Sequence, residues 1–296
     1  MTAWLAGIEG TGAARTLAMV LALTAAILHA LFGALQKGRY DPWTARTAID
    51  MALAAISAPV AILLVPWPPL HLWWLFAGAV LIHFTYKVLM ALTYERGAYT
   101  VVYPVVRGTG PLFTVLAAGS IFGEHFTGTQ WVGVGFLLAG LFGLSAYNMA
   151  KVTVARDTLV PALCLAVATG MMVAVYTTWD AWGIRAVENP FTFLAWFFLL
   201  DGLSFPVVAA LRGRLRRPDP ALVRLAVMGA FMAFGSFGSV MMATRLDSVG
   251  EAAILRETST VFAALIGWLW LKEPVGPRRA GLMALIALGA VVVEFG

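Results

Sequence analysis

The chain has 296 residues, of which 61% are hydrophobic and only 12% are charged, and its mean hydropathy is +0.86. Because soluble domains carry about 25% charged residues, this composition excludes an aqueous globular fold and indicates that the solvent is lipid. The net charge of +5 is then typical of Lys and Arg in cytoplasmic loops, and does not indicate nucleic-acid binding. A single cysteine, Cys164, excludes an internal disulfide framework and a multi-cysteine metal site.

Ten segments of the chain are apolar and long enough to cross a bilayer as helices, which takes about 20 residues each. The turns between them are short, as in "PWPPL" and "LKEPVGP", so no linker separates aqueous domains. The fold class predicted is an all-α, multi-pass integral protein of the cytoplasmic (inner) membrane. The ten segments cover residues 16–36, 47–65, 72–95, 99–122, 129–148, 158–184, 190–211, 221–244, 249–271 and 277–294.

The chain contains an internal repeat with an offset of 149 residues. Four identical pairs share this offset: Arg107 with Arg256, Phe113 with Phe262, Glu124 with Glu273, and Gly140 with Gly289. Since each repeat holds five helices, an odd number, the second repeat enters the membrane from the opposite face. The pattern predicts two inverted five-helix repeats, residues 1–150 and 151–296, around a central cavity, as in secondary transporters.

Glycine and proline positions give two further expectations. A close approach of a neighbouring helix is expected at four glycines of the fifth segment: Gly133, Gly135, Gly140 and Gly143. Pro104 and Pro111 interrupt the hydrogen-bond ladder of the fourth segment, which predicts a bend near Arg107. Glu124 and Glu273 fall at helix ends, where they are expected to cap a helix or to pair in the loop.

Lys and Arg are unevenly divided between the two faces of this topology. The face that holds both termini has only Arg15, Arg185 and Arg245, whereas the other loop cations lie on the opposite face. By the positive-inside rule, both termini are therefore expected outside the cytoplasm.

Short motifs along the chain support a family resemblance. The "FGE" turn at residues 122–124 precedes a glycine-rich segment, and "WLKEP" at 270–274 precedes the last segment. Residues 174–183 read "AVYTTWDAWG", and residues 29–37 read "HALFGALQK", with His29 where a Trp is common. These features resemble the EamA-type branch of the drug/metabolite transporter superfamily. The resemblance implies ten helices and a central cavity that opens alternately to each side, and it often implies both termini in the cytoplasm, opposite to the charge count.

Several polar side chains fall inside the predicted helices, where a charge costs several kcal/mol and usually faces a cavity or a partner. Helical spacing places Tyr99, Tyr103 and Arg107 on one stripe of the fourth segment. The other candidate substrate-binding residues are His29 in the first segment, His83 and Lys87 in the third, Tyr176 and Asp180 in the sixth, and Arg256, Glu257 and Thr258 in the ninth.

Each candidate has a functional and a structural interpretation. Arg107 or Arg256 would bind a carboxylate or phosphate through two hydrogen bonds, and Asp180 or Glu257 would hold a cationic group. Alternatively, the arginines pair with these carboxylates or with backbone carbonyls as fixed struts.

The two intramembrane histidines, His29 and His83, are candidates for proton carriers because imidazole titrates near neutral pH. The alternative for each is a packing residue with a satisfied hydrogen bond.

The inverted repeat and the family resemblance predict transport. Without a Walker A, dinucleotide or HExxH motif there is no sign of an ATP-driven pump or a zinc protease, so the function predicted is secondary active transport. The expected substrate is a small polar metabolite, zwitterionic or anionic, such as an amino acid or related carboxylate, moved by alternating access and driven by a proton gradient or by exchange. One alternative is a cationic metabolite such as choline, held by aromatic side chains. An intramembrane enzyme and a non-transporting scaffold are alternatives of another class. No catalytic residue, metal or cofactor is expected. The expected partners are the substrate and the lipid bilayer, for a monomer or homodimer that binds no nucleic acid.

Overall fold

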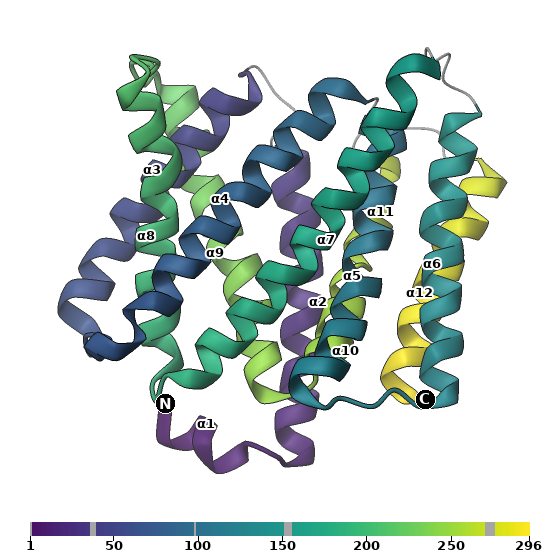
Figure 1. The fold of residues 1–296 in the computed structure, drawn as a ribbon, viewed down its shortest axis with the longest axis horizontal. Helices are drawn as coiled ribbons and strands as arrows, with labels where there is room; N and C mark the ends of the chain where they lie inside the picture. Colours follow the sequence, from purple (N-terminus) through teal and green to yellow (C-terminus); the bar gives the residue numbers. More distant parts are fainter. Residues whose placement is uncertain (1, 36–39, 98, 151–155, 270–275) are drawn as a thin grey trace.

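The computed structural model describes residues 2–35, 40–97, 99–150, 156–269 and 276–296 (Figure 1), and within them the chain is helical without any strand. The elements are α1 (Thr2–Ile8), α2 (Gly12–Leu35), α3 (Pro42–Pro59), the π-helical turn η1 (Val60–Leu64), the short η2 (Leu70–Leu72), α4 (Trp73–Arg96), α5 (Tyr99–Phe122), α6 (Gly128–Met149), α7 (Arg156–Ala186), α8 (Pro190–Leu211), α9 (Pro220–Leu246), α10 (Val249–Arg256), α11 (Ser259–Leu269) and α12 (Pro277–Phe295).

The ten predicted segments correspond to the helices that cross the bundle. Nine spans in the described parts of the chain are long and apolar enough to cross a membrane, and the last of them, Val249–Leu269, contains both α10 and α11. The tenth segment is α12, whose 19 residues approach the length that a bilayer core requires. The prediction of an all-α, multi-pass membrane protein is confirmed, and the short α1 is an addition that hydropathy did not indicate.

Local sequence sets the start of several helices. Three of them begin with an Asp or Asn followed by proline: Asp41–Pro42 in α3, Asn189–Pro190 in α8 and Asp219–Pro220 in α9. In each case the side chain of the first residue accepts a hydrogen bond from a backbone amide of the first turn. Proline suits the next position because it lacks the amide hydrogen that would otherwise have no partner.

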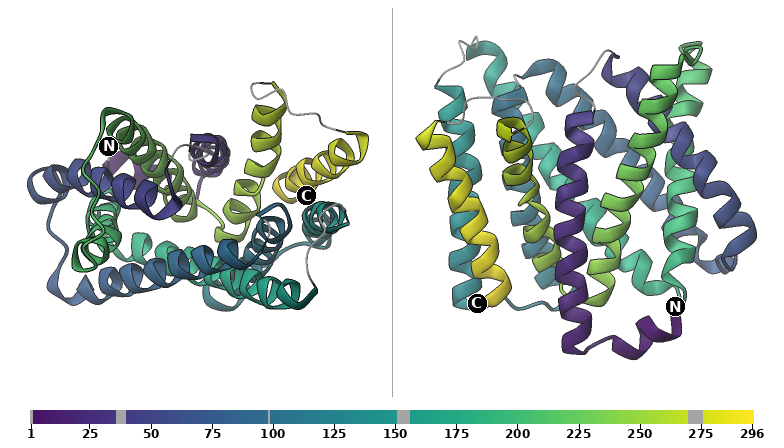
Figure 2. Two further views of the ribbon diagram at one scale, coloured as in Figure 1. Left: turned by 90° about the horizontal axis from the view of Figure 1, so that it is seen from above. Right: turned by 180° about the vertical axis from the view of Figure 1, so that it is seen from behind.

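The two repeats run in opposite directions, and their contacts are related by the same exchange. Both termini lie at one end of the bundle in Figure 1. If α2–α6 are matched in order with α7, α8, α9, the α10–α11 span and α12, the contact of α2 with α9 corresponds to that of α7 with α4. In the same way, the contact of α5 with α7 corresponds to that of the α10–α11 span with α2. Figure 2 shows α2, in purple, between α9 and α11. The predicted inverted arrangement is therefore the arrangement observed.

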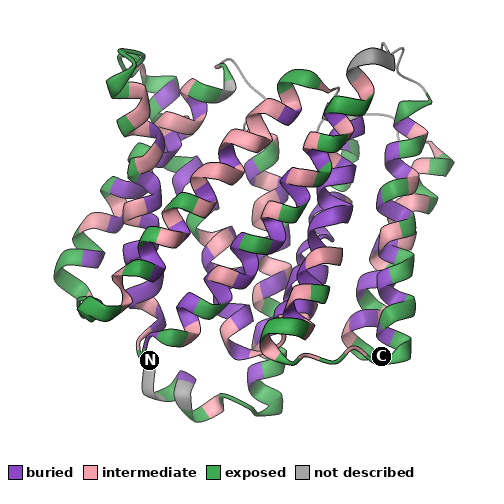
Figure 3. Ribbon diagram, in the orientation of Figure 1, coloured by how far each residue is buried: buried purple, intermediate pink, exposed green. Residues whose placement is uncertain are grey.

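The exterior of the bundle is apolar, as a lipid solvent requires. Large hydrophobic side chains such as Leu63, Leu81 and Phe231 are exposed, while charged side chains including Asp50 and Glu257 are fully buried. Figure 3 shows buried residues on the inward faces of the helices and exposed ones around the outside. Polar chemistry is thus concentrated in the interior.

Glycines bring α6 and α12 into backbone contact. A Cβ atom at Gly289 would lie 2.6 Å from the carbonyl oxygen of Gly133, and a Cβ atom at Gly133 would lie 2.8 Å from that of Gly289. Gly140 and Gly143 also face α12, whereas a Cβ atom at Gly135 would meet nothing within 4 Å. The expectation of close packing is confirmed at three of the four glycines and is wrong for Gly135, because that residue lies on the outward face of α6.

We expect Gly289→Leu to destabilise the fold, because the new side chain must displace backbone atoms of α6 rather than a flexible side chain. The loss should be about 2–3 kcal/mol, in the upper part of the range for overpacking. Thermal unfolding in detergent measures it, with Gly135→Leu as the matched control that should unfold as the wild type does. Equal melting temperatures for the two variants would contradict the contact.

The described span Val249–Leu269, in the second repeat, is divided into two helices. The helix α5 is continuous through both Pro104 and Pro111, so no break occurs near Arg107. Its counterpart stops after Arg256 and resumes at Ser259. The sequence there contains neither glycine nor proline, and hydropathy predicted a single helix.

Candidate functional site

The break between α10 and α11 is stabilised by hydroxyl groups at membrane depth. Thr258 donates its hydroxyl hydrogen to the carbonyl oxygen of Leu255 at 2.7 Å, and Thr260 donates to that of Glu257 at 2.7 Å. The same two carbonyls also accept the backbone amides of Thr258 and Thr260, at 3.1 Å in each case, so the break is a tightened turn to which the hydroxyls add a second donor. The side chains of Arg256 and Glu257, which lie at this turn, contact different neighbours.

Arg107 of α5 faces this break and joins the two repeats. Its Nε lies 2.9 Å from Oε2 of Glu257, its Nη2 donates to the hydroxyl of Ser259, and its guanidinium lies 5.7 Å from the ring centroid of Tyr103. The Nε–H is not directed at the carboxylate, so both Glu257 oxygens lack a hydrogen bond among the described residues. The pair is an electrostatic contact whose acceptors remain available.

Arg256 points away from Glu257, toward α7. Its guanidinium lies 5.8 Å from the ring centroid of Tyr176, and it makes no ion pair or hydrogen bond within the part of the chain that is described. It borders a small internal void of about 10 Å³, roughly the room that one water molecule needs. The lining residues are Tyr176, Thr177, Asp180, Phe237, Val240, Met241, Thr244 and Arg256.

The void is lined by an acidic and a basic residue, each with a buried polar atom that makes no hydrogen bond among the described residues. Oδ1 of Asp180, the hydroxyl of Thr177 and Nε of Arg256 are buried and make no hydrogen bond in the described structure. An unsatisfied buried polar group costs about 1–3 kcal/mol, so the arrangement favours a ligand that supplies a donor to Asp180 and an acceptor to Arg256. The remaining walls, such as Phe237 and Met241, are apolar.

His83 of α4 holds the other oxygen of Asp180. Its Nε2 lies 2.8 Å from Oδ2 of Asp180, and both side chains are only 4% exposed. The imidazole is packed between Tyr176 and Phe197, with ring centroids 4.7 and 4.8 Å away.

Lys87, one turn from His83 on α4, belongs to a separate buried network with α3 and α8. Its Nζ lies 3.0 Å from Asp50 Oδ2 and 2.9 Å from Asp201 Oδ1, and Nε of Arg46 lies 2.8 Å from Asp50 Oδ1. Two cations balance two carboxylates, which is the composition of a structural tie. Asp50 was not singled out from the sequence, although a carboxylate inside an apolar segment is a detectable signal.

The remaining candidates lie at the edges of these groups. His29 of α2 is half-buried, with its ring in edge contact with Phe237 at 6.3 Å. Phe237 and Thr177 were missed by the sequence analysis, because single aromatic and hydroxyl residues are common in membrane helices. The side chain of Tyr99 and the whole of Glu273 lie outside the described residues.

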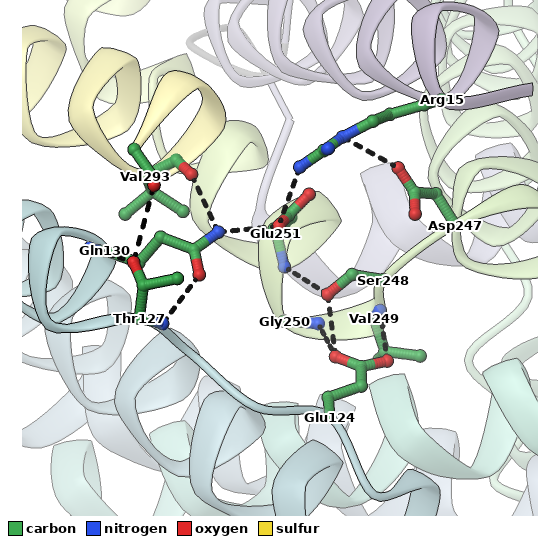
Figure 4. Close-up of polar contacts among 11 residues, drawn as sticks. Arg15, Glu124, Thr127, Gln130, Asp247, Ser248, Val249, Gly250, Glu251 and Val293 are labelled. Carbon is green, nitrogen blue, oxygen red and sulfur yellow. Dashed lines mark hydrogen bonds and ion pairs between the residues drawn. The ribbon is translucent and has the colours of Figure 1, made fainter. Parts of the chain in front are cut away.

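Polar contacts gather around the start of α10 at the end of the bundle that carries the termini (Figure 4). They lie beside a pocket of about 570 Å³ whose lining includes Arg15, Gln130 and Glu251. The Glu124 carboxylate accepts hydrogen bonds from the Ser248 hydroxyl at 2.7 Å and from the backbone amides of Val249 and Gly250 at 2.7 and 3.0 Å. Glu124 thus caps a helix other than its own, which confirms the expectation that it caps or pairs in the loop.

Two further side chains tie α10 to its neighbours at this end. Arg15 of α2 lies 3.4 Å from Glu251, and the amide group of Gln130 in α6 donates to Glu251 at 2.7 Å and to the Val293 carbonyl at 3.1 Å.

Burial differs along the broken span. Residues 252–256 are all buried, and α10 packs against α2, α5, α7, α9 and α12. In α11, by contrast, Leu265, Trp268 and Leu269 are exposed, and its main contacts are with α2 and α12. Neighbouring helices therefore surround α10, whereas one face of α11 lies at the surface of the bundle.

Glu124→Gln should weaken the cap at the start of α10, because glutamine keeps one acceptor but loses the negative charge that favours a helix N-terminus. We expect a loss of about 1–2 kcal/mol in the free energy of unfolding. Thermal unfolding in detergent is the measurement. Glu95→Gln, at an exposed glutamate near the end of α4, is the matched control and should unfold as the wild type does. A similar shift in both variants would indicate a general charge effect instead of a cap.

Comparisons with known proteins agree with this architecture. The sequence model of the EamA-like transporter family matches residues 16–146 and again residues 160–295. A solved structure described only as "Crystal structure of protein" has a TM-score of 0.75 and 19% sequence identity, over 94% of this chain and 98% of its own, which shows a shared fold. A search of curated proteins finds no match. The family match covers both five-helix repeats and most of their length, so the chain belongs to the EamA-like transporter family, within the drug/metabolite transporter superfamily.

Proposed function

We propose that this membrane transporter is a secondary active carrier of a small zwitterionic metabolite, an amino acid or a closely related carboxylate, in the cytoplasmic membrane. The observation that carries the proposal is that Asp180 and Arg256 line one void and that each has a buried polar atom, Oδ1 and Nε, without a hydrogen bond among the described residues. The ammonium group of the substrate would bind Asp180, and its carboxylate would bind Arg256 through the planar guanidinium.

Transport requires that this site open, because a void of about 10 Å³ is much smaller than an amino acid. The α10–α11 break lies beside the site and would supply a hinge between α10, which α2, α5, α7, α9 and α12 surround, and α11, which packs mainly on α2. Alternating access would then move α11 and α10 in turn, with the Arg107–Glu257 contact between the repeats near the pivot.

A choline-like substrate fits these contacts less well. It would leave Arg256 without an anion, and the Tyr176 ring that would face a quaternary ammonium is already covered by the Arg256 guanidinium at 5.8 Å. A purely anionic substrate would leave Asp180 unsatisfied and would be repelled by it.

Counterflow in proteoliposomes tests the proposal without any ion gradient. Vesicles loaded with unlabelled L-leucine, which has an apolar side chain suited to Phe237 and Met241, should accumulate labelled L-leucine from outside. Vesicles loaded with choline or with succinate should not accumulate the corresponding labelled compound, and protein-free vesicles give the background. Counterflow of choline or succinate without that of L-leucine, L-phenylalanine or L-methionine would overturn the assignment.

A further inference from the structure

We propose that the His83–Asp180 pair is the proton site of this transporter, and that a proton and the ammonium group of the substrate compete for the Asp180 carboxylate. The inference rests on the proposed function, because it concerns the same carboxylate. It identifies the energy source as a proton moved in exchange for the substrate.

The geometry that carries the inference is a carboxylate with two different faces. Oδ2 of Asp180 contacts the imidazole of His83 at 2.8 Å, on the side of α4. Asp180 also lines the void, and Oδ1 of the same carboxylate has no hydrogen-bond partner among the described residues. A charge added at either face is therefore felt at the other across a single functional group.

His83 is the group in this neighbourhood suited to carrying the proton. Lys87 is committed to two carboxylates, Asp50 and Asp201, at 3.0 and 2.9 Å, and Arg256 stays charged at any accessible pH. The His83 ring contacts Tyr176 of α7 and the uncharged Phe237 of α9. The other charged and titratable side chains of this region contact one another or these two rings: Tyr86 and Lys87 on α4, Arg107 and Tyr103 on α5, Asp201 on α8, Arg256 at the end of α10, Glu257 after it, and His29 on α2.

The physical consequence is reciprocal linkage between proton and substrate. With a proton on His83, the imidazolium neutralises Asp180 and repels an ammonium group at the void. Without the proton, the carboxylate presents a net negative charge to the void and binds the ammonium group. Substrate binding therefore releases a proton from His83, and substrate affinity rises as the proton concentration falls, by about tenfold or more.

The test compares wild-type protein with His83→Gln. Glutamine can still donate a hydrogen bond to Asp180 but cannot carry a proton at neutral pH. Addition of L-leucine to wild-type protein in weakly buffered detergent solution should release about one proton per molecule bound, read with a pH indicator dye. His83→Gln should bind L-leucine without this release and with an affinity that no longer depends on pH. In proteoliposomes, it should lose the accumulation that a pH gradient drives.

His71→Gln is the matched control, because His71 is an exposed histidine in η2, and it should keep both the proton release and the gradient-driven accumulation. Three results would overturn the inference: no proton release by wild-type protein, release that persists in His83→Gln, or release that disappears in His29→Gln instead. If the variants do not fold, the absence of proton release by wild-type protein still overturns the inference. L-Leucine counterflow at equal pH is measured on the same preparations. Its presence without proton release refutes only the coupling site, whereas its absence for every zwitterion refutes the proposed function.

Discussion

Arg107→Ala is expected to lower the free energy of unfolding by about 3–5 kcal/mol, the largest effect of any single substitution considered for this protein. The reason is that Glu257, with a fully buried side chain, would keep its charge but lose the guanidinium 2.9 Å away. If so, the double variant Arg107→Ala with Glu257→Gln should recover most of the stability, since no unpaired charge remains. Thermal unfolding of the single and double variants in detergent measures both effects. A double variant no more stable than Arg107→Ala would show that the lost contacts are not electrostatic.

Arg107→Lys separates the structural role of this arginine from a direct role in binding. Lysine keeps the positive charge near Glu257 but lacks the planar group that binds a carboxylate through two hydrogen bonds. If Arg107 also contacts the negative group of the substrate, as the stripe with Tyr103 predicts, the affinity should fall by about tenfold, or about 1.4 kcal/mol. Unchanged affinity in folded Arg107→Lys protein would leave Arg107 as the partner of Glu257 alone.

Arg256→Gln is expected to reduce substrate affinity by about a hundredfold, or about 2.8 kcal/mol, with little change in stability. Arg256 makes no ion pair within the described residues, so its removal leaves no carboxylate without a partner. In the transport assay, L-leucine counterflow should fall to background. Isothermal titration and thermal unfolding on the same preparation provide the two readouts.

The variants Arg107→Ala and Arg107→Lys are the matched controls for Arg256→Gln. Both arginines lie at the same break, and they are equivalent positions of the sequence repeat, 149 residues apart. The expected pattern is a loss of affinity without a loss of stability for Arg256, and a loss of stability for Arg107→Ala. A destabilised Arg256→Gln with normal affinity would refute the role assigned to Arg256.

The sequence by itself determined the membrane setting, the ten spans and the inverted repeat. These depend on local and additive properties: apolar length sets a span, and an odd number of spans per repeat reverses the second one. Helical spacing also placed Tyr103 and Arg107 on one face, and they lie together in the structure. The glycines of α6 were predictable as a class, but the outward position of Gly135 depends on where α12 lies.

Only the tertiary structure decided which buried charges meet. The sequence favoured Arg107, on its polar stripe, over Arg256 for substrate contact, yet Arg107 contacts Glu257 and Arg256 borders the Asp180 void. The difference arises at the α10–α11 break, a turn without glycine or proline in which the hydroxyls of Thr258 and Thr260 bond to carbonyl oxygens that also accept backbone amides. A buried charge selects its partner by distance in three dimensions, and helix packing, which brings residues about 150 positions apart to within 3 Å, is not encoded in the spacing of any one helix.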